Sequence, residues 1–186
     1  METFYTFKRS EWRKYLAANF EKKSEIWFVF PTKASGEKCL SYNDAVEEAL
    51  CFGWIDGRAG TLDKDHHIRR FTPRRKGSDY SRPNIERLIL LDSQGLLHPK
   101  VREEVLPVIS RRFEFPEDIM EELNGDEEVR KNFSKFSEPY KRIRVAYIEA
   151  ARKRPDEFKK RLNYFMEKTR KGKLITGYGG IDKYYK

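Results

Sequence analysis

Carboxylates, histidines and arginines are concentrated between residues 41 and 87 of the chain. The groups that could act as acid and base are Asp56, Asp63, Asp65, His66 and His67. Carboxylates near histidines permit hydrolysis, in which one group takes a proton and another returns it. Loop sequences often contain both residue types, so a hydrolase is an alternative, and we expect the protein to be non-catalytic.

The two cysteines do not suit nucleophilic catalysis. A reactive thiol needs a lowered pKa, which a helix N-terminus or a nearby positive charge provides. Cys51 instead falls in the last turn of a predicted helix, one turn from Glu47 and Glu48, and both effects raise its pKa. Cys39 lies in a turn before Ser41 and has no such signature. We therefore expect no thiol chemistry.

Metal and nucleotide sites are not predicted either. Neighbouring residues of a strand point to opposite faces, so His66 and His67 cannot easily bind one metal ion together. The third histidine, His98, is in a later segment, and the paired spacing of a zinc site is missing. Because no phosphate-loop or dinucleotide glycine pattern occurs, we predict no cofactor.

A hairpin is predicted from segments 54–59 and 66–72, which flank a turn-rich loop at 60–65. In such a hairpin Asp56 and Arg58 project together, and Arg69 or Arg70 joins them beside Trp54. Guanidinium groups bind carboxylates and phosphates in bidentate fashion. The alternation therefore favours an anion site, with cross-strand ion pairing on an exposed sheet face as the alternative.

A basic loop, Pro73–Ser78, leaves the hairpin and leads into a helix that begins near Ser81. A basic loop that feeds a helix N-terminus suits an anion. We interpret Trp54 as an apolar wall, Asp56 as an acceptor that orients an arginine, and Arg70 as an anion contact. The predicted ligand-binding residues are Trp54, Asp56, Arg58, Arg70, Arg74, Arg75, Ser78, Ser81 and Asn84.

Composition indicates a folded protein without a membrane span. Charged residues make up 37% and the mean hydropathy is -0.84, but 13 Phe, 10 Tyr and 3 Trp argue against disorder. No apolar run approaches the roughly 20 residues that a transmembrane helix needs, and residues 1–15 lack the apolar core of a signal peptide. Two cysteines are too few for a secreted disulfide framework, so we expect a cytoplasmic protein.

The net charge of +9 is unevenly distributed. Residues 1–129 hold 21 Lys and Arg against 24 Asp and Glu, whereas residues 130–186 hold 18 against 6. Such an excess attracts polyanions, including nucleic acid, although a lysine-rich helical face is often simply solvated. Within this part, helical spacing predicts a buried stripe of Tyr140, Ile143, Tyr147, Ala150 and Ala151.

The motif ALCFGWIDG, then RRFTPRRKGS with Ser81, Asn84 and Arg87, resembles the YdeI/OmpD-associated (bacteriocin-protection) proteins. The resemblance begins at SEWRKYLAANF and continues to YIEAARKRPDEFKKRL, so it covers nearly the whole chain. Tyr80 stands where the family usually has Trp, and Glu157-Phe158 replaces a usual Thr-Arg. The resemblance implies a link to envelope stress or bacteriocin resistance and no settled biochemical activity.

The sequence thus predicts an α+β fold, predominantly helical, with a small, mainly antiparallel N-terminal sheet and a basic C-terminal helical lobe. We expect an N-terminal domain at 1–114, the basic lobe at 115–175 and a flexible tail at 176–186. The predicted function is non-catalytic binding of a small anionic ligand. Binding of nucleic acid or another polyanion through the basic lobe is the first alternative, and an Asp/His hydrolase is the second.

Overall fold

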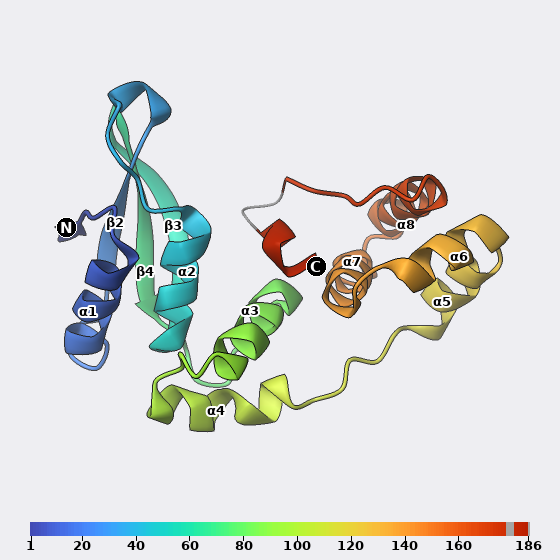
Figure 1. Cartoon of the computed structure of the whole chain (residues 1–186), viewed down its shortest axis with the longest axis horizontal. Coiled ribbons are helices and arrows are strands. Elements are labelled where there is room, and N and C mark those ends of the chain that lie inside the picture. The colour runs from blue at the N-terminus through green and yellow to red at the C-terminus, as the bar shows by residue number, and fades with distance from the viewer. Residues whose placement is uncertain (178–180, 186) are drawn as a thin grey trace. The chain divides into compact units, whose positions relative to one another are not determined.

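The computed structural model describes residues 1–177 and 181–185, and the chain forms two compact units (Figure 1). The N-terminal unit comprises residues 1–80 and 87–109. The C-terminal unit comprises residues 81–86 and 110–186. Helix α3 (Arg82–Ser93) therefore contributes its first residues to one unit and its remainder to the other.

The N-terminal unit contains the sheet and the helices that cover it. Its strands are β1 (Thr3–Phe4), β2 (Ile26–Pro31), β3 (Trp54–Asp63) and β4 (His66–Pro73). Its helices are α1 (Arg9–Asn19), the 3-10 turn η1 (Lys33–Ser35), α2 (Tyr42–Cys51), the later part of α3, and α4 (Pro99–Ile109).

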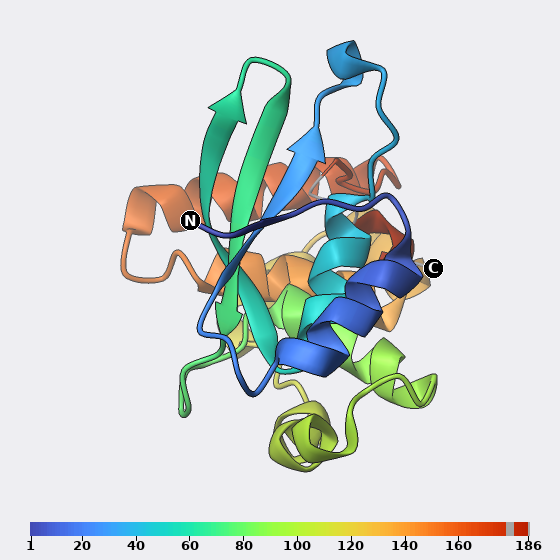
Figure 2. The same ribbon diagram turned by 90° about the vertical axis from the view of Figure 1, so that its left-hand side faces the viewer.

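The sheet has the strand order β1-β2-β4-β3. β1 runs parallel to β2, and the other two pairs are antiparallel, so the sheet is mixed but mainly antiparallel. In β2, Ile26 and Phe28 face the core, which also takes Phe71 from β4. Figure 2 shows α1 and α2 beside each other along the sheet, and both contribute buried side chains to this core.

Local sequence signals position α2. The Ser41 hydroxyl accepts a hydrogen bond from the Asp44 N–H at 3.0 Å, which caps the helix as its residue types predict. Gly53 has φ of 71°, a left-handed conformation that glycine adopts readily and that ends the helix. α2 therefore begins and ends where the sequence indicates, and it brings a face of three carboxylates toward α1.

The elements of the C-terminal unit, among its described residues, are helices and a 3-10 turn. It contains the first turn of α3, then α5 (Glu117–Asn124), α6 (Glu127–Lys135), α7 (Glu138–Glu149), α8 (Pro155–Arg170) and the 3-10 turn η2 (Ile181–Tyr185). Its own core includes Phe133, Tyr140 and Phe165, whose rings meet near edge-on or tilted. The α+β, predominantly helical fold class is confirmed.

Three local expectations need correction or comment. The hairpin loop is shorter than predicted, because β3 continues through residues 60–63 by means of register shifts and only two residues separate the strands. On α7, Tyr140 and Ile143 are buried, but Tyr147 is 43% exposed. Of the predicted flexible tail, residues 178–180 and 186 lie outside the described residues, and Ile181, Tyr184 and Tyr185 are buried.

Candidate functional site

Trp54 lies in the core rather than at a binding surface. Its side chain is 1% exposed, and its indole N–H donates to the Phe20 carbonyl at 3.0 Å. The hydrogen bond satisfies the one polar atom of a large buried ring, as such rings require. The predicted role as an apolar wall of an open site stays a prediction, and the contacts of Trp54 are those of a core residue.

Asp56 and Arg70 point to opposite faces of the sheet. Asp56 is directly opposite Phe71 in the register, so it shares the helix-covered face. Its carboxylate accepts the Tyr42 hydroxyl at 2.6 Å and lies 3.8 Å from Arg69. Arg70 is opposite Trp27 on the other face and pairs with Glu25 at 2.5 Å. The structure brings Asp56 together with Arg69 and not with Arg70.

Arg58 does not accompany Asp56 across the hairpin, because a register shift lies between residues 56 and 59. Ala59, not Arg58, is opposite Arg69, and the Arg58 side chain is exposed. A β-bulge of this kind re-aims side chains that strict alternation would place together. The simple period-two argument therefore holds on the second strand of the hairpin and fails on the first.

The basic loop is held by its own contacts. The Arg74 guanidinium lies 3.4 Å from the centre of the Tyr80 ring and donates to the Ser78 carbonyl at 2.5 Å and hydroxyl at 2.9 Å. The Ser78 hydroxyl in turn donates to the Arg75 carbonyl at 2.7 Å. Arg75 itself is exposed. The structure thus brings Arg74 and Ser78 together, and they form hydrogen bonds with each other.

Ser81 and Asn84 lie at the beginning of α3, where the N–H groups of Asn84 and Ile85 donate to the Ser81 carbonyl at 2.9 and 3.0 Å. Both residues belong to the C-terminal unit, whereas the hairpin and the basic loop belong to the N-terminal one. The nine predicted residues are therefore divided between two units. Ser81 alone of the nine lines a pocket of the C-terminal unit, which is described below.

Among the acid–base residues of the hydrolase alternative, Asp63 and His66 lie together, whereas Asp56 lies apart from them. The two ring nitrogens of His66 lie 2.8 Å from Asp63 and 2.9 Å from Glu37, and these carboxylates raise the pKa of the imidazole. Asp56 is opposite Phe71, five residues along β4 from His66, which is about 17 Å at the rise of a strand. His66 therefore lies between Asp63 and Glu37 at the tip of the hairpin, too far from Asp56 to contact it.

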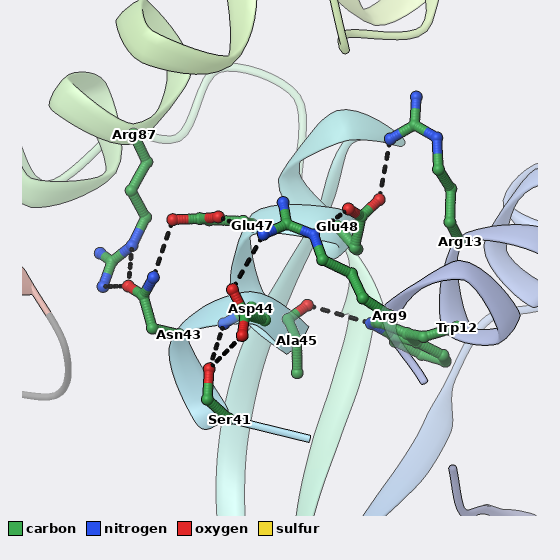
Figure 3. A network of polar contacts seen from close by, with 10 residues as sticks. All are labelled: Arg9, Trp12, Arg13, Ser41, Asn43, Asp44, Ala45, Glu47, Glu48 and Arg87. Atoms are coloured by element: carbon green, nitrogen blue, oxygen red, sulfur yellow. Dashed lines mark hydrogen bonds and ion pairs between the residues drawn. The ribbon is translucent and has the colours of Figure 1, made fainter. Parts of the chain in front are cut away.

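A charged network that the sequence analysis missed joins α1, α2 and α3 in the N-terminal unit (Figure 3). Arg9 bonds Glu48 at 2.5 Å and Asp44 at 2.8 Å, while Arg13 bonds Glu48 at 2.8 Å. Glu47 and Glu48 are 2% and 3% exposed. Two features of the sequence could have revealed the network. Arg9 and Arg13 are four residues apart on one helix, and acidic residues follow at helical spacing on the next.

The same network continues to α3. The Arg87 guanidinium donates to the Asn43 amide oxygen at 2.9 and 3.1 Å, and the Asn43 amide donates to Glu47 at 2.7 Å. Cys51 at the end of α2 is fully buried, and burial, followed by the charge of Glu48, raises its pKa to about 11. Among the described residues, no cluster of three His, Cys, Asp or Glu side chains could hold a metal ion. This network connects α1, α2 and α3 and has a structural role.

The C-terminal unit contains a pocket of about 320 Å³. Three segments build it: the beginning of α3, one side of α7, and η2. Its walls are mainly apolar or aromatic, with two arginines and a serine among them. The lining residues are Ser81, Arg82, Pro83, Ile143, Arg144, Ala146, Tyr147, Ala150, Ile181 and Tyr185.

Arg82, at the pocket, is oriented by a buried carboxylate. The Arg82 Nε donates to Glu86 at 2.7 Å, and Arg142 donates to both oxygens of Glu86 at 2.7 and 2.8 Å. Two guanidinium groups thus share one carboxylate that is 3% exposed. The helical spacing predicts a buried stripe on this side of α7, but Tyr147 and Ala150 are exposed and line the pocket instead.

Comparisons with known families divide the chain at nearly the same place as the two units. Residues 4–104, more than half of the chain, match a domain of unknown function, DUF8412. Residues 112–172 match the family described as bacteriocin-protection, YdeI or OmpD-associated. The chain therefore belongs to the family defined by DUF8412, and the second match confirms the resemblance to the YdeI/OmpD-associated family over residues 112–172. No curated protein and no solved structure matches the chain.

The recognised family is thus matched through the C-terminal range, which contains α5 to α8. The motif at residues 41–87, on which the resemblance was first based, lies in the range of the domain of unknown function. No described helix has the length and apolar character needed to cross a membrane.

Proposed function

We propose that this protein is a non-catalytic binder of a small ligand with an apolar body and an anionic group, held in the pocket of the C-terminal unit. The observation that carries the proposal is a pocket of about 320 Å³ with apolar walls and two arginines in its lining. This volume is at the lower end of the range for small-molecule sites, and a few convergent polar groups in an apolar cavity are typical of them.

Local charge favours an anionic group on the ligand. Lys141, Arg142 and Arg82 surround the carboxylates of Glu86 and Glu138, so three cations meet two anions. Arg144, which is 5% exposed, adds another cation at the pocket. Guanidinium groups bind carboxylates and phosphates through paired hydrogen bonds. A carboxylate or phosphate on the ligand would therefore suit Arg82, which Glu86 already orients.

The chemistry of the lining favours binding over catalysis. Among the described residues that line this pocket there is no carboxylate, histidine or cysteine, so its serine and tyrosine hydroxyls have none of these groups in the lining to act as a base. Arginines and a serine hydroxyl can bind and orient a ligand. We assign the binding to bacteriocin resistance on the description of the family that residues 112–172 match, and we keep envelope stress and a cytoplasmic location as expectations from the sequence.

A thermal-shift screen tests the proposal, with carboxylates, nucleotides, sugar phosphates and cell-wall precursors as probes. A ligand at about 100 times its Kd adds roughly 2.7 kcal/mol to the stability of the unit that binds it. At roughly 4–8 °C per kcal/mol for a unit of this size, its melting temperature should rise by about 11–22 °C. Far-UV circular dichroism is the readout, because the C-terminal unit contains no tryptophan.

Matched variants locate the site. Ala146→Phe fills the pocket, and Arg82→Met removes one cation from it, so both should abolish the shift. Arg142→Met is the control, because Arg142 also bonds Glu86 but does not line the pocket. A shift that survives Ala146→Phe and Arg82→Met but is lost in Arg70→Ala would refute this site and favour the hairpin instead.

A further inference from the structure

A second hollow of the C-terminal unit, of about 200 Å³, has a different character from the first. Residues of α7 and α8 form most of it, and the groups that matter here are Tyr147, Tyr164, Lys160 and Arg161. Its lining contains several aromatic rings and cations and one carboxylate, Glu157, which accepts from Arg161 at 2.8 Å, whereas the first pocket is mainly apolar. The small-ligand proposal does not use Tyr164, Lys160 or Arg161.

Two tyrosine rings are exposed at this hollow. Tyr147 is 43% exposed and Tyr164 is 46% exposed, although both belong to helices with buried faces. The Arg161 guanidinium lies 3.8 Å from the centre of the Tyr147 ring, and the Lys168 amine lies 5.2 Å from that of Tyr164. Each ring is thus paired with a cation by a cation–π contact, at the surface and not in the core.

The cations and the ring of α8 form a line along one flank of the helix. Arg161, Tyr164 and Lys168 are three or four residues apart and therefore neighbours on the helix surface. From residue 161 to residue 168 the helix rises about 10 Å. A stacked strand of nucleic acid advances about 3.4 Å per nucleotide, so this flank has the length of about three nucleotides.

We propose that this surface binds single-stranded nucleic acid, with Tyr147 and Tyr164 stacking on bases and Lys160 and Lys168 contacting phosphates. Charge complementarity supports this partner, since residues 130–186 contain 18 Lys and Arg against 6 Asp and Glu. Exposed aromatic rings in a basic groove are how proteins hold unpaired bases without reading their sequence. A duplex would not offer its base faces to the tyrosines.

The surface adjoins the first pocket, because Tyr147 and Arg144 line both hollows. Variants that separate the two proposals must therefore avoid these residues. Lys160 and Tyr164 line only the second hollow, and Lys168 contacts Tyr164. Loss of oligonucleotide binding in these variants, with the small-ligand shift retained, would identify two independent functions.

Fluorescence anisotropy with labelled dT12, U12 and a 12-base-pair DNA duplex tests the proposal on the full-length chain. We expect the single strands to bind more tightly than the duplex at equal salt. Tyr164→Ala should weaken single-strand binding at least fivefold, while Tyr164→Phe, which keeps the ring, should stay within twofold of the wild type. Lys160→Ala with Lys168→Ala should reduce the slope of log K against log salt by about 1.4.

Two controls match these changes. Tyr5→Ala removes a tyrosine that is 42% exposed in the N-terminal unit, and Lys131→Ala with Lys135→Ala removes two cations from α6. Both should leave affinity within twofold. Absent binding of the single strands, equal binding of the duplex with no effect of Tyr164→Ala, or stronger binding to anionic lipid vesicles with the same dependence on Tyr164 would overturn the proposal.

Discussion

Glu48 provides a direct test of the charged network in the N-terminal unit (Figure 3). The substitution Glu48→Gln preserves the shape of the side chain and removes its charge. The carboxylate is 3% exposed and accepts from Arg9 Nε at 2.5 Å and from Arg13 Nη1 at 2.8 Å. The variant would therefore weaken two charge-assisted hydrogen bonds that tie α1 to α2.

Arg9 and Arg13 lose different shares of their hydrogen bonds in this variant. Arg9 keeps Asp44 at 2.8 Å and Glu47 at 3.0 Å, whereas Arg13 keeps the Leu96 carbonyl at 2.7 Å. A hydrogen bond to a charged group contributes about 1.5–3 kcal/mol, and breaking a fully buried pair costs about 3–5 kcal/mol. Because both arginine side chains are about one-third exposed, at 35% and 34%, water replaces part of the loss. We expect a destabilisation of about 2–3 kcal/mol.

Tryptophan fluorescence during urea denaturation isolates this effect. Trp12, Trp27 and Trp54 all belong to the N-terminal unit, so their emission reports its unfolding and not that of the C-terminal unit. With a slope of about 2 kcal/mol per M, the urea midpoint of Glu48→Gln should fall by about 1–1.5 M. Glu21→Gln, which removes an exposed partner of Lys100, should leave the midpoint unchanged.

The outcome separates two descriptions of the network. A midpoint change below about 0.5 M for Glu48→Gln would correspond to less than about 1 kcal/mol, the value of an exposed ion pair. The network would then be a solvated cluster, and the inference that it ties α1 to α2 would be wrong. An altered slope would instead mean that the substitution changes how much surface is exposed on unfolding.

Two further predictions concern titratable groups of the N-terminal unit. Hydrogen bonds that His66 donates to Asp63 and then Glu37 raise its pKa above 6.5. The stability that they contribute is fully present below pH 6.5 and is lost as pH rises through the folded pKa. His66→Gln should therefore lower the melting temperature more at pH 6 than at pH 8.5. An equal loss at both pH values would contradict this pH dependence. Burial and Glu48 raise the pKa of Cys51 to about 11, so in native Cys39→Ser a thiol reagent at pH 8 should react only after urea is added. Rapid reaction without urea would show that the thiol is accessible.

Local signals predicted the elements well because each depends on neighbours in sequence. The Ser41 cap, the Gly53 stop and the alternation along β4 involve contacts within four residues, and the structure confirms all three. The same alternation failed between Asp56 and Ala59, where a register shift changes which residue is opposite Arg69. Nothing in the local pattern shows where such a bulge occurs, because it depends on pairing with another strand.

Long-range partners explain why the predicted site was not recovered as one group. Arg70 pairs with Glu25, which precedes it by 45 residues, and Arg9 pairs with Glu48 across 39 residues. The order of residues in the sequence does not show which arginines and lysines form ion pairs with carboxylates in the folded protein. Trp54 was similarly placed at a surface by its motif, but its burial follows from packing against residues far along the chain.

The two parts of the chain differ in net charge and in how their charged side chains are engaged. The N-terminal part has nearly balanced charges, and its arginines at the hairpin and helices are largely engaged with carboxylates, carbonyls or tyrosine rings. Residues 130–186 contain three times as many Lys and Arg as Asp and Glu, so this part keeps a net positive charge although several of its cations pair with carboxylates. An anionic partner gains more from an uncompensated charge than from one that must first break an internal pair. This difference, and the match of the C-terminal range to the recognised family, is why both proposed sites lie in the C-terminal unit.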